Sequence, residues 1–132
     1  MKYLLDTNIC IYIINRRPEK ILKRFRSLEP GDVAVSAITL YELLYGAYKS
    51  GKPAQNKEAV RLFVSPLEVL PFDEGAADVC GNLRAILERS GDVIGAMDIQ
   101  IAAIALVYDL TLITNNTIEF ERISDLKLDN WL

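Results

Sequence analysis

Four acidic side chains lie at points where chemistry could occur: Asp6, Glu42, Asp98 and Glu119. Asp6 directly follows the short apolar run 3–5, and Asp98 precedes the apolar run 101–108. Each acid could have an ordinary structural role when taken alone. Asp6 and Asp98 could each cap a helix N-terminus, Asn116 could cap the short helix that follows it, and Glu42 and Glu119 could face water. The question is therefore whether the fold brings these acids together.

Acids at strand ends and helix starts of a parallel sheet would meet at one edge of that sheet. Their mutual repulsion is tolerable when a cation lies between them. Ligand sets made only of oxygen, without His or Cys, select Mg²⁺ or Mn²⁺ among the common metals. Convergence of the acids therefore predicts a divalent cation site.

The chain contains no histidine and two cysteines. Lack of histidine excludes His-ligated zinc, the usual general base and nucleophile pairs of the Ser/His or Cys/His kind. Cys10 and Cys80 lie in apolar helical patterns with no CxxC spacing, which predicts two buried thiols. The chemistry is left to carboxylates, hydroxyls, lysines or a metal.

The length of 132 residues predicts a single domain, 1–132, that can bury a substantial core. The composition is 51% hydrophobic and 25% charged, as in globular proteins. The apolar runs are too short for a membrane span, and the start lacks the order of a signal peptide. We expect a cytoplasmic protein with no membrane partner.

The net charge of −3 is unevenly distributed. Residues 1–30 hold seven Lys and Arg against three acids, whereas residues 66–132 hold four against twelve. A basic face beside an acid-rich half is typical of a protein that attracts a polyanion and concentrates carboxylates at a metal. Ordinary solvated helix faces would give the same counts.

Apolar patterns and turn residues predict alternating strands and helices. The predicted strands are 3–5, 33–35, 68–72, 110–114 and 126–128. Predicted helices follow Asp6-Thr7-Asn8 and cover 18–28, 36–50, 53–64, 74–89, 98–108 and 117–122. Buried strands separated by helices predict an α/β fold, a three-layer α/β/α arrangement with a central parallel sheet.

The predicted helix 36–50, starting at Ser36 or Thr39, separates its side chains by face. Leucines form a core stripe, and Glu42 falls on the opposite side, where Gly46 leaves space beside it. Three tyrosines form a second stripe: Tyr41, Tyr45 and Tyr48. This tyrosine stripe is either the edge of the core or a surface for a partner.

Four motifs resemble those of PIN-domain ribonucleases, best those of the VapC type, the toxin half of toxin–antitoxin pairs. They are Leu4-Leu5-Asp6-Thr7-Asn8, residues 36–43, residues 95–103 and Thr114-Asn115-Asn116-Thr117-Ile118-Glu119-Phe120. The resemblance spans the whole chain, including Asp129-Asn130-Trp131. Each motif is weak alone, and four in order are strong.

The resemblance implies a metal-dependent endoribonuclease in which Asp6, Glu42 and Asp98 hold Mg²⁺ or Mn²⁺. It implies that bound cations polarise the scissile phosphate and activate water, leaving a 5′-phosphate and a 3′-hydroxyl. Thr7, Asn8 and Thr114 are the candidates for orienting the acids or contacting phosphate. Cellular RNA, such as tRNA or rRNA, is the implied substrate.

One departure concerns the turn after the fourth predicted strand, Asn115-Asn116, where many PIN domains have an aspartate. Asn116 can offer a metal a neutral oxygen but no charge. Glu119 could supply the missing carboxylate. The number of bound metals stays open.

The resemblance also implies a homodimer and a small antitoxin protein whose tail covers the acidic pocket with a basic side chain. The tyrosine stripe and the helix 18–28 are the candidate surfaces for these contacts.

Two other functions compete with this one. Asp6 resembles the nucleophile of haloacid-dehalogenase phosphatases, but those place a second aspartate where this chain has Asn8. A PIN-like RNA- or protein-binding module with a weakened site is the non-enzymatic alternative, supported by the missing fourth aspartate.

Overall fold

The computed structural model describes all residues, 1–132, and contains one sheet of five parallel strands. The strands are β1 (Tyr3–Leu5), β2 (Val33–Ser36), β3 (Glu68–Leu70), β4 (Thr111–Ile113) and β5 (Leu128–Asp129). Their order across the sheet is β3-β2-β1-β4-β5, so β1 is central. Every strand is parallel to its neighbours because a helix crosses over between successive strands.

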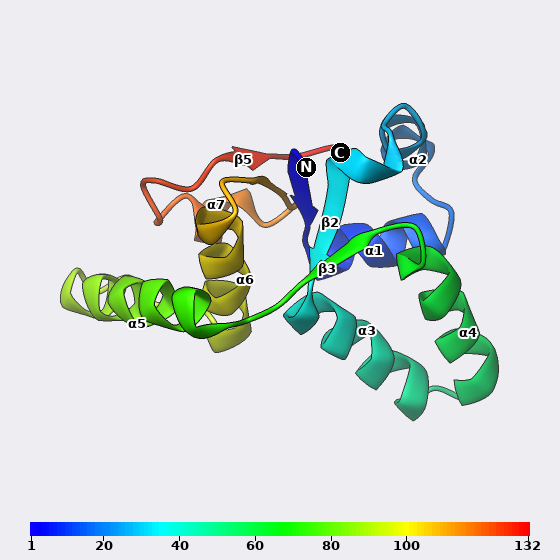
Figure 1. The fold of residues 1–132 in the computed structure, drawn as a ribbon, viewed down its shortest axis with the longest axis horizontal. Helices are drawn as coiled ribbons and strands as arrows, with labels where there is room; N and C mark the ends of the chain where they lie inside the picture. The colour runs from blue at the N-terminus through cyan, green and yellow to red at the C-terminus, as the bar shows by residue number, and fades with distance from the viewer.

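Helices cover both faces of the sheet, as Figure 1 shows. One group is α1 (Thr7–Ile14), α2 (Glu19–Arg26), α3 (Ala37–Lys49) and α4 (Pro53–Val64). The other is α5 (Glu74–Arg89), α6 (Ala96–Val107) and α7 (Thr117–Phe120). A single 3₁₀ turn, Pro30–Asp32, precedes β2. The predicted three-layer α/β/α fold with a parallel sheet is confirmed.

Two hydrophobic cores form because successive strand residues point to opposite faces. Leu4 and Leu112 contribute to the core beneath α5 and α6, whereas Leu5 and Ile113 contribute to the core beneath α1 to α4. All four side chains are fully buried. The short strands are therefore apolar on both faces, as a covered parallel sheet requires.

The ends of several elements differ from the sequence predictions. Helix α6 begins at Ala96 with Gly95 as its N-cap, so Asp98 lies inside the first turn and the prediction that it opens or caps the helix is wrong. The last strand is shifted toward the C-terminus, at Leu128–Asp129. Helix α7 is only four residues long. Such ends depend on backbone partners that a periodic pattern does not specify.

Burial of the thiols matches the prediction in one case. Cys10 is fully buried under the sheet, whereas Cys80, on α5, is only partly buried. Helix α6 is buried on all sides from Ile101 to Ala105, but Val107 at its end is exposed. None of the helices combines the length and the apolar composition that a membrane crossing needs.

Candidate active site at the carboxyl edge of the sheet

The two central strands end side by side, and each is followed by a polar residue. Leu5 of β1 pairs with Ile113 of β4, and the backbone N–H of Asp6 donates to the carbonyl of Ile113 at 2.9 Å. This ladder places Asp6 next to Thr114. The hydroxyl of Thr114 donates to Oδ2 of Asp6 at 2.8 Å, and Thr114 is fully buried.

The Asp6 carboxylate is held at both oxygens. Besides the Thr114 hydroxyl, the backbone N–H of Thr7 donates to its Oδ1 at 2.8 Å, so Asp6 also caps α1. Only 6% of Asp6 is exposed. Because this carboxylate is buried and hydrogen-bonded at both oxygens, it cannot rotate as a surface acid does. Asp6 therefore caps a helix and can also belong to a functional site.

Glu42 reaches the same edge from α3. Ser36, at the end of β2, caps this helix by accepting from the N–H of Thr39 at 2.9 Å. The Thr7 hydroxyl donates to Oε1 of Glu42 at 2.6 Å and lies 3.1 Å from the hydroxyl of Thr39. Thr7 thus links Glu42 to the Asp6 turn, and the alternative of a solvated Glu42 is wrong.

Asp98 and Glu119 approach each other above Gly95. The charge of Glu119 and a hydrogen bond to it are among the causes that raise the pKa of Asp98. The backbone N–H of Gly95 donates to Oε1 of Glu119 at 3.0 Å, and the side-chain amide of Asn116 donates to its Oε2 at 2.8 Å. A Cβ at position 95 would stand 3.5 Å from Oδ2 of Asp98 and 3.9 Å from Oε1 of Glu119, so Gly95 lies directly against both carboxyl groups.

The pKa values of Asp6, Asp98 and Glu119 are shifted, in part because these acids lie close to one another. Burial, together with the charges of Asp6, Glu119 and Glu42, raises the pKa of Asp98 to about 7. Burial also raises the pKa of Asp6, although the hydrogen bonds from Thr114 and Thr7 oppose this. Burial acts to raise the pKa of Glu119, but the hydrogen bonds from Asn116 and Gly95 outweigh it and lower the pKa.

We define the acid cluster as Asp6, Glu42, Asp98 and Glu119. None of its members forms a salt bridge, since the four ion pairs of the chain involve other acids. No three of them lie close enough together to share one ion as the side chains stand. The four acids therefore influence one another's charge at one edge of the sheet without forming a closed ligand set.

The remaining predicted residues have different positions. Asn116 is exposed and holds Glu119, and its side chain does not cap α7, contrary to the capping alternative. Glu119 does not simply face water, as the same alternative held, because it contacts Asp98. Asn8 is exposed and makes no side-chain hydrogen bond, so the structure does not bring it into the cluster.

Three contacts had no clear signal in the sequence. They are the Gly95 N–H on Glu119, the Thr39 hydroxyl near Thr7, and the amide of Asn115 donating to the Tyr12 hydroxyl at 3.1 Å. The first contact uses a backbone N–H, which every residue except proline has, so the residue type does not predict it. The others join elements far apart in the chain, and their register cannot be read from spacing.

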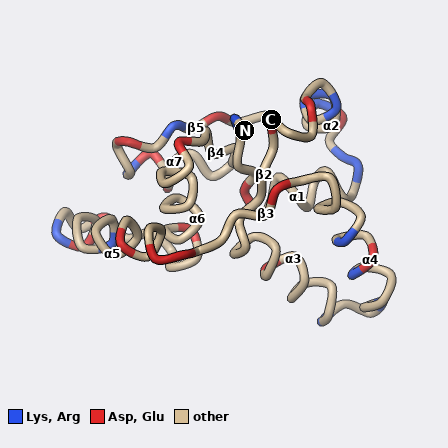
Figure 2. The backbone as a smooth tube through the Cα atoms, viewed as in Figure 1, with Lys and Arg blue, Asp and Glu red and all other residues tan.

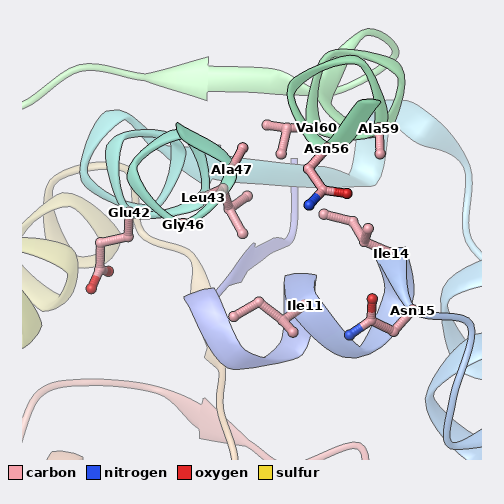
Figure 3. Close-up of a pocket in the computed structure, with 10 residues that line it drawn as sticks. All are labelled: Ile11, Ile14, Asn15, Glu42, Leu43, Gly46, Ala47, Asn56, Ala59 and Val60. Atoms are coloured by element: carbon pink, nitrogen blue, oxygen red, sulfur yellow. The ribbon is translucent and has the colours of Figure 1, made fainter. Parts of the chain in front are cut away.

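An apolar groove adjoins the acid cluster. It encloses about 270 Å³ between α1, α3 and α4 and is lined by Ile11, Leu43, Gly46 and Val60 among others. Figure 3 shows these side chains around the space, with the carboxylate of Glu42 at one end. Glu42 therefore belongs to both the acid cluster and the groove.

The raised pKa of Asp98 predicts a pH dependence of stability in EDTA. Between its ordinary value of 3.8 and about 7, the folded protein holds more protons than the unfolded chain. The free energy of unfolding should therefore fall as the pH rises from 5 to 7.5. Urea denaturation across this range measures the slope.

Asp98→Asn removes the titrating group and should flatten that profile, whereas Asp125→Asn, at an acid outside the cluster, should not. A profile of Asp98→Asn with the wild-type slope would contradict the assignment of the charge crowding to Asp98.

Comparison with protein families places the chain among known relatives. The family model described as PIN domain matches residues 3–126. Ribonuclease VapC2 of Haemophilus influenzae is 46% identical over 132 residues, covering 100% of this chain and 99% of that protein. The tRNA(fMet)-specific endonuclease VapC of Shigella flexneri is 43% identical, covering 99% of this chain and 98% of its own length.

Solved structures agree over the whole chain. DNA-bound VapBC from Salmonella typhimurium matches with a TM-score of 0.94 and 44% identity, covering 100% of this chain and 99% of that one. VapBC2 from Rickettsia felis, bound to a DNA fragment from its promoter, matches with a TM-score of 0.93 and 41% identity, and each chain is fully covered. The chain therefore belongs to the PIN-domain family and, within it, to the VapC proteins.

Proposed function

We propose that this protein is an endoribonuclease of the VapC type that uses Mg²⁺ or Mn²⁺ bound by the acid cluster. The observation that carries the proposal is a set of four converging carboxylates with no cationic side chain paired to any of them. Uncompensated buried charge is costly, and a divalent cation is the partner that an all-oxygen set attracts.

The side chains divide the work by position. Asp6 and Asp98 are the proposed ligands, with Glu42 and Glu119 around them, acting directly or through water. A divalent cation bound there would polarise the scissile phosphate and lower the pKa of a water molecule. Thr7 and Thr114 fix the carboxylates of Glu42 and Asp6 in place.

Asn116 takes a modified role in this proposal. Because its amide N–H donates to Glu119, it orients that carboxylate and leaves its own oxygen for a weak contact with the ion. Asn8 is exposed at the start of α1, where it is available to a phosphate. Relatives from Shigella flexneri and Salmonella typhimurium carry names specifying tRNA(fMet), which makes structured RNA such as tRNA the proposed substrate.

Cleavage assays test the nuclease. Purified protein should cleave RNA with Mg²⁺ or Mn²⁺ and stop with EDTA. Asp6→Asn and Asp98→Asn should each lower the rate by roughly a hundredfold or more, since a lost ligand removes several kcal/mol of charge stabilisation. Asp125→Asn is the matched control and should keep wild-type activity.

Two results would contradict this proposal. Equal cleavage by the wild type and both variants would point to a contaminating nuclease. RNA binding without any cleavage, in the presence of either metal, would favour the alternative of a weakened binding module. Mapping of 5′-phosphate ends after expression would then identify the RNA and the bond that an active enzyme cuts.

A small antitoxin is the proposed inhibitor, since the matched solved structures are VapBC complexes. We assign its apolar residues to the groove between α1, α3 and α4. A basic side chain beyond them would reach Glu42 at the end of the groove and enter the acid cluster. Burial of apolar surface supplies the affinity, and the charge contact blocks the ions.

Filling the groove tests the antitoxin site. A Cβ at Gly46 meets nothing within 4 Å, so Gly46→Leu should fold and occupy the groove. Gly81→Leu, on the exposed side of α5 with equally open space, is the matched control. Gly46→Leu should weaken binding of the small antitoxin protein by at least roughly tenfold, as about two lost side-chain contacts would.

Isothermal titration with that small protein gives both affinities. Binding of Gly46→Leu with the affinity of Gly81→Leu would exclude the groove as its site.

A homodimer is proposed through the tyrosine stripe. Tyr41, Tyr45 and Tyr48 are 55%, 56% and 58% exposed along one face of α3, which is unusual for three neighbouring aromatic side chains. Lys49 lies over the ring of Tyr45 at 4.9 Å, and Lys57 lies over that of Tyr48 at 5.1 Å. These rings offer a flat, partly apolar face to a second copy.

Light scattering tests the dimer. The double variant Tyr41→Ser/Tyr45→Ser should halve the molar mass observed in solution, because it removes the apolar face. Ile86→Ser, at an exposed apolar residue of α5, should leave the mass unchanged. A dimer that survives the tyrosine changes would assign the interface to another face.

A further inference from the structure

A second cavity lies between α2 and the end of the chain, away from the apolar groove. It encloses about 430 Å³ and is lined by Lys20, Lys23, Arg24, Asp129, Asn130 and Trp131. Figure 1 shows the C-terminus beside α2, and Figure 2 shows Lys and Arg gathered on this helix. We call this space the basic cavity.

The cations of the basic cavity have no acidic partner. Arg26, outside it, pairs with Glu19 at 3.6 Å, but Lys20, Lys23 and Arg24 take part in no salt bridge. All three side chains are exposed on the side of α2 opposite its buried residues. Three unpaired cations around one hollow create a local positive potential that attracts an anion.

Trp131 supplies a second, independent observation. It lines the basic cavity yet is only 4% exposed, and its indole N–H is buried without any hydrogen-bond partner. A buried donor left unpaired is costly and rare in folded proteins, so a ligand whose binding opened this N–H to an acceptor would remove that cost. The guanidinium of Arg24 stands 5.8 Å from the centre of the Trp131 ring.

The end of the chain presents further donors. Asn130 uses its side-chain oxygen to accept from the N–H of Leu132 at 3.0 Å, which leaves its amide N–H groups without a protein partner. Asp129 is the single acid of the lining, and its Oδ1 accepts from the N–H of Asn130 at 2.8 Å. The cavity therefore offers mostly donors and positive charge, which is the complement of a phosphate.

The basic cavity is connected to the acid cluster through Thr114. The N–H of Thr114 donates to the carbonyl of Asp129 at 3.1 Å, while its hydroxyl donates to Asp6. Residues on both sides of Thr114 thus lie at the carboxyl edge of the same sheet.

We propose that the basic cavity binds a backbone phosphate of the RNA at a position remote from the bond that is cut. The proposal rests on the proposed function in one respect, that RNA is the polymer. Lys20, Lys23 and Arg24 contribute charge, and the Trp131 and Asn130 N–H groups contribute hydrogen bonds. Such contacts hold a substrate in register without reading its sequence.

Trp131 is the only tryptophan of the chain, so its fluorescence reports on the cavity directly. The experiment titrates a labelled single-stranded RNA oligonucleotide into the Asp98→Asn protein in EDTA, where no cleavage occurs. Anisotropy measures binding while tryptophan emission is followed. Both signals should change over the same RNA concentrations.

The test variant is Lys20→Ala/Lys23→Ala in that background. Its Kd for RNA should rise about tenfold, and the slope of log K against log salt should fall by about 1.4, as two lost phosphate contacts on a single strand require. The matched control is Lys52→Ala/Arg89→Ala, at two exposed unpaired cations on other elements, with less than about a twofold effect.

Trp131→Phe keeps an aromatic ring at this position but removes the indole N–H, and should raise Kd about fivefold, as for one lost hydrogen bond. Circular dichroism checks that each variant is folded. The lysine variants leave the core intact, so they decide the outcome even where Trp131→Phe unfolds.

Several results would overturn the proposal. They are equal weakening by both double variants, RNA binding without a change in Trp131 emission, and an equally strong emission change with polyglutamate, which would indicate an acidic protein partner instead. Emission that varies with protein concentration alone would assign the cavity to a second copy.

Failure of the nuclease proposal is separate, because it is judged by cleavage. A protein that cleaves RNA but whose Lys20→Ala/Lys23→Ala variant binds like the control would refute the cavity alone. If the wild type never cleaves RNA but the Lys20→Ala/Lys23→Ala variant binds RNA more weakly than the control variant, the nuclease proposal is refuted and the cavity proposal stands.

Discussion

Repulsion among carboxylates that lie near one another without a salt bridge to any of them is the constraint on which the rest of this structure depends. Asp6 is buried and fixed by two donors, and Asp98 is left with a pKa of about 7. The free energy of unfolding would be higher if these acids were paired with Lys or Arg or were replaced by uncharged residues. Asp6 is held instead by neutral donors, the Thr114 hydroxyl and the Thr7 N–H, which is the arrangement that our proposed cation site requires.

The architecture tolerates this strain because the acids stand at the edge of a strongly packed body. The strands behind them are buried on both faces, and the helices on each face close two separate cores. Thr7 lies at the start of a helix and Thr114 at the end of a strand, so their backbones are held firmly. Because each hydroxyl donates to an acid, Glu42 and Asp6, these threonines also fix the positions of those carboxylates. Precision at the site is thus inherited from the sheet.

Most of the fold could be predicted from sequence, because runs such as Tyr3–Leu5 and Thr111–Ile113 are apolar and bounded by polar residues. The parallel arrangement also predicted that Asp6, Glu42 and Asp98 would lie near one another, and their charges do act on one another, although no three acids are close enough to share one ion. What periodicity could not supply was the start of α6, where Gly95 caps through its backbone. The role of Asn116 was equally hidden, because only the structure shows that its amide holds Glu119.

The separation of charge along the chain acquires a physical meaning once the fold is known. The acid cluster would repel RNA unless cations neutralised it, so a nuclease with this site needs attraction from elsewhere on its surface. Helix α2 is the element best suited to this. Its apolar residues Ile21 and Leu22 are buried, and its Lys and Arg side chains are exposed on the other side. In our proposals, attraction of RNA and its cleavage therefore take place at different sites, and Thr114 is hydrogen-bonded to a residue of each. Such a division lets the acids remain close together without the loss of affinity for a polyanion that their charge would otherwise impose.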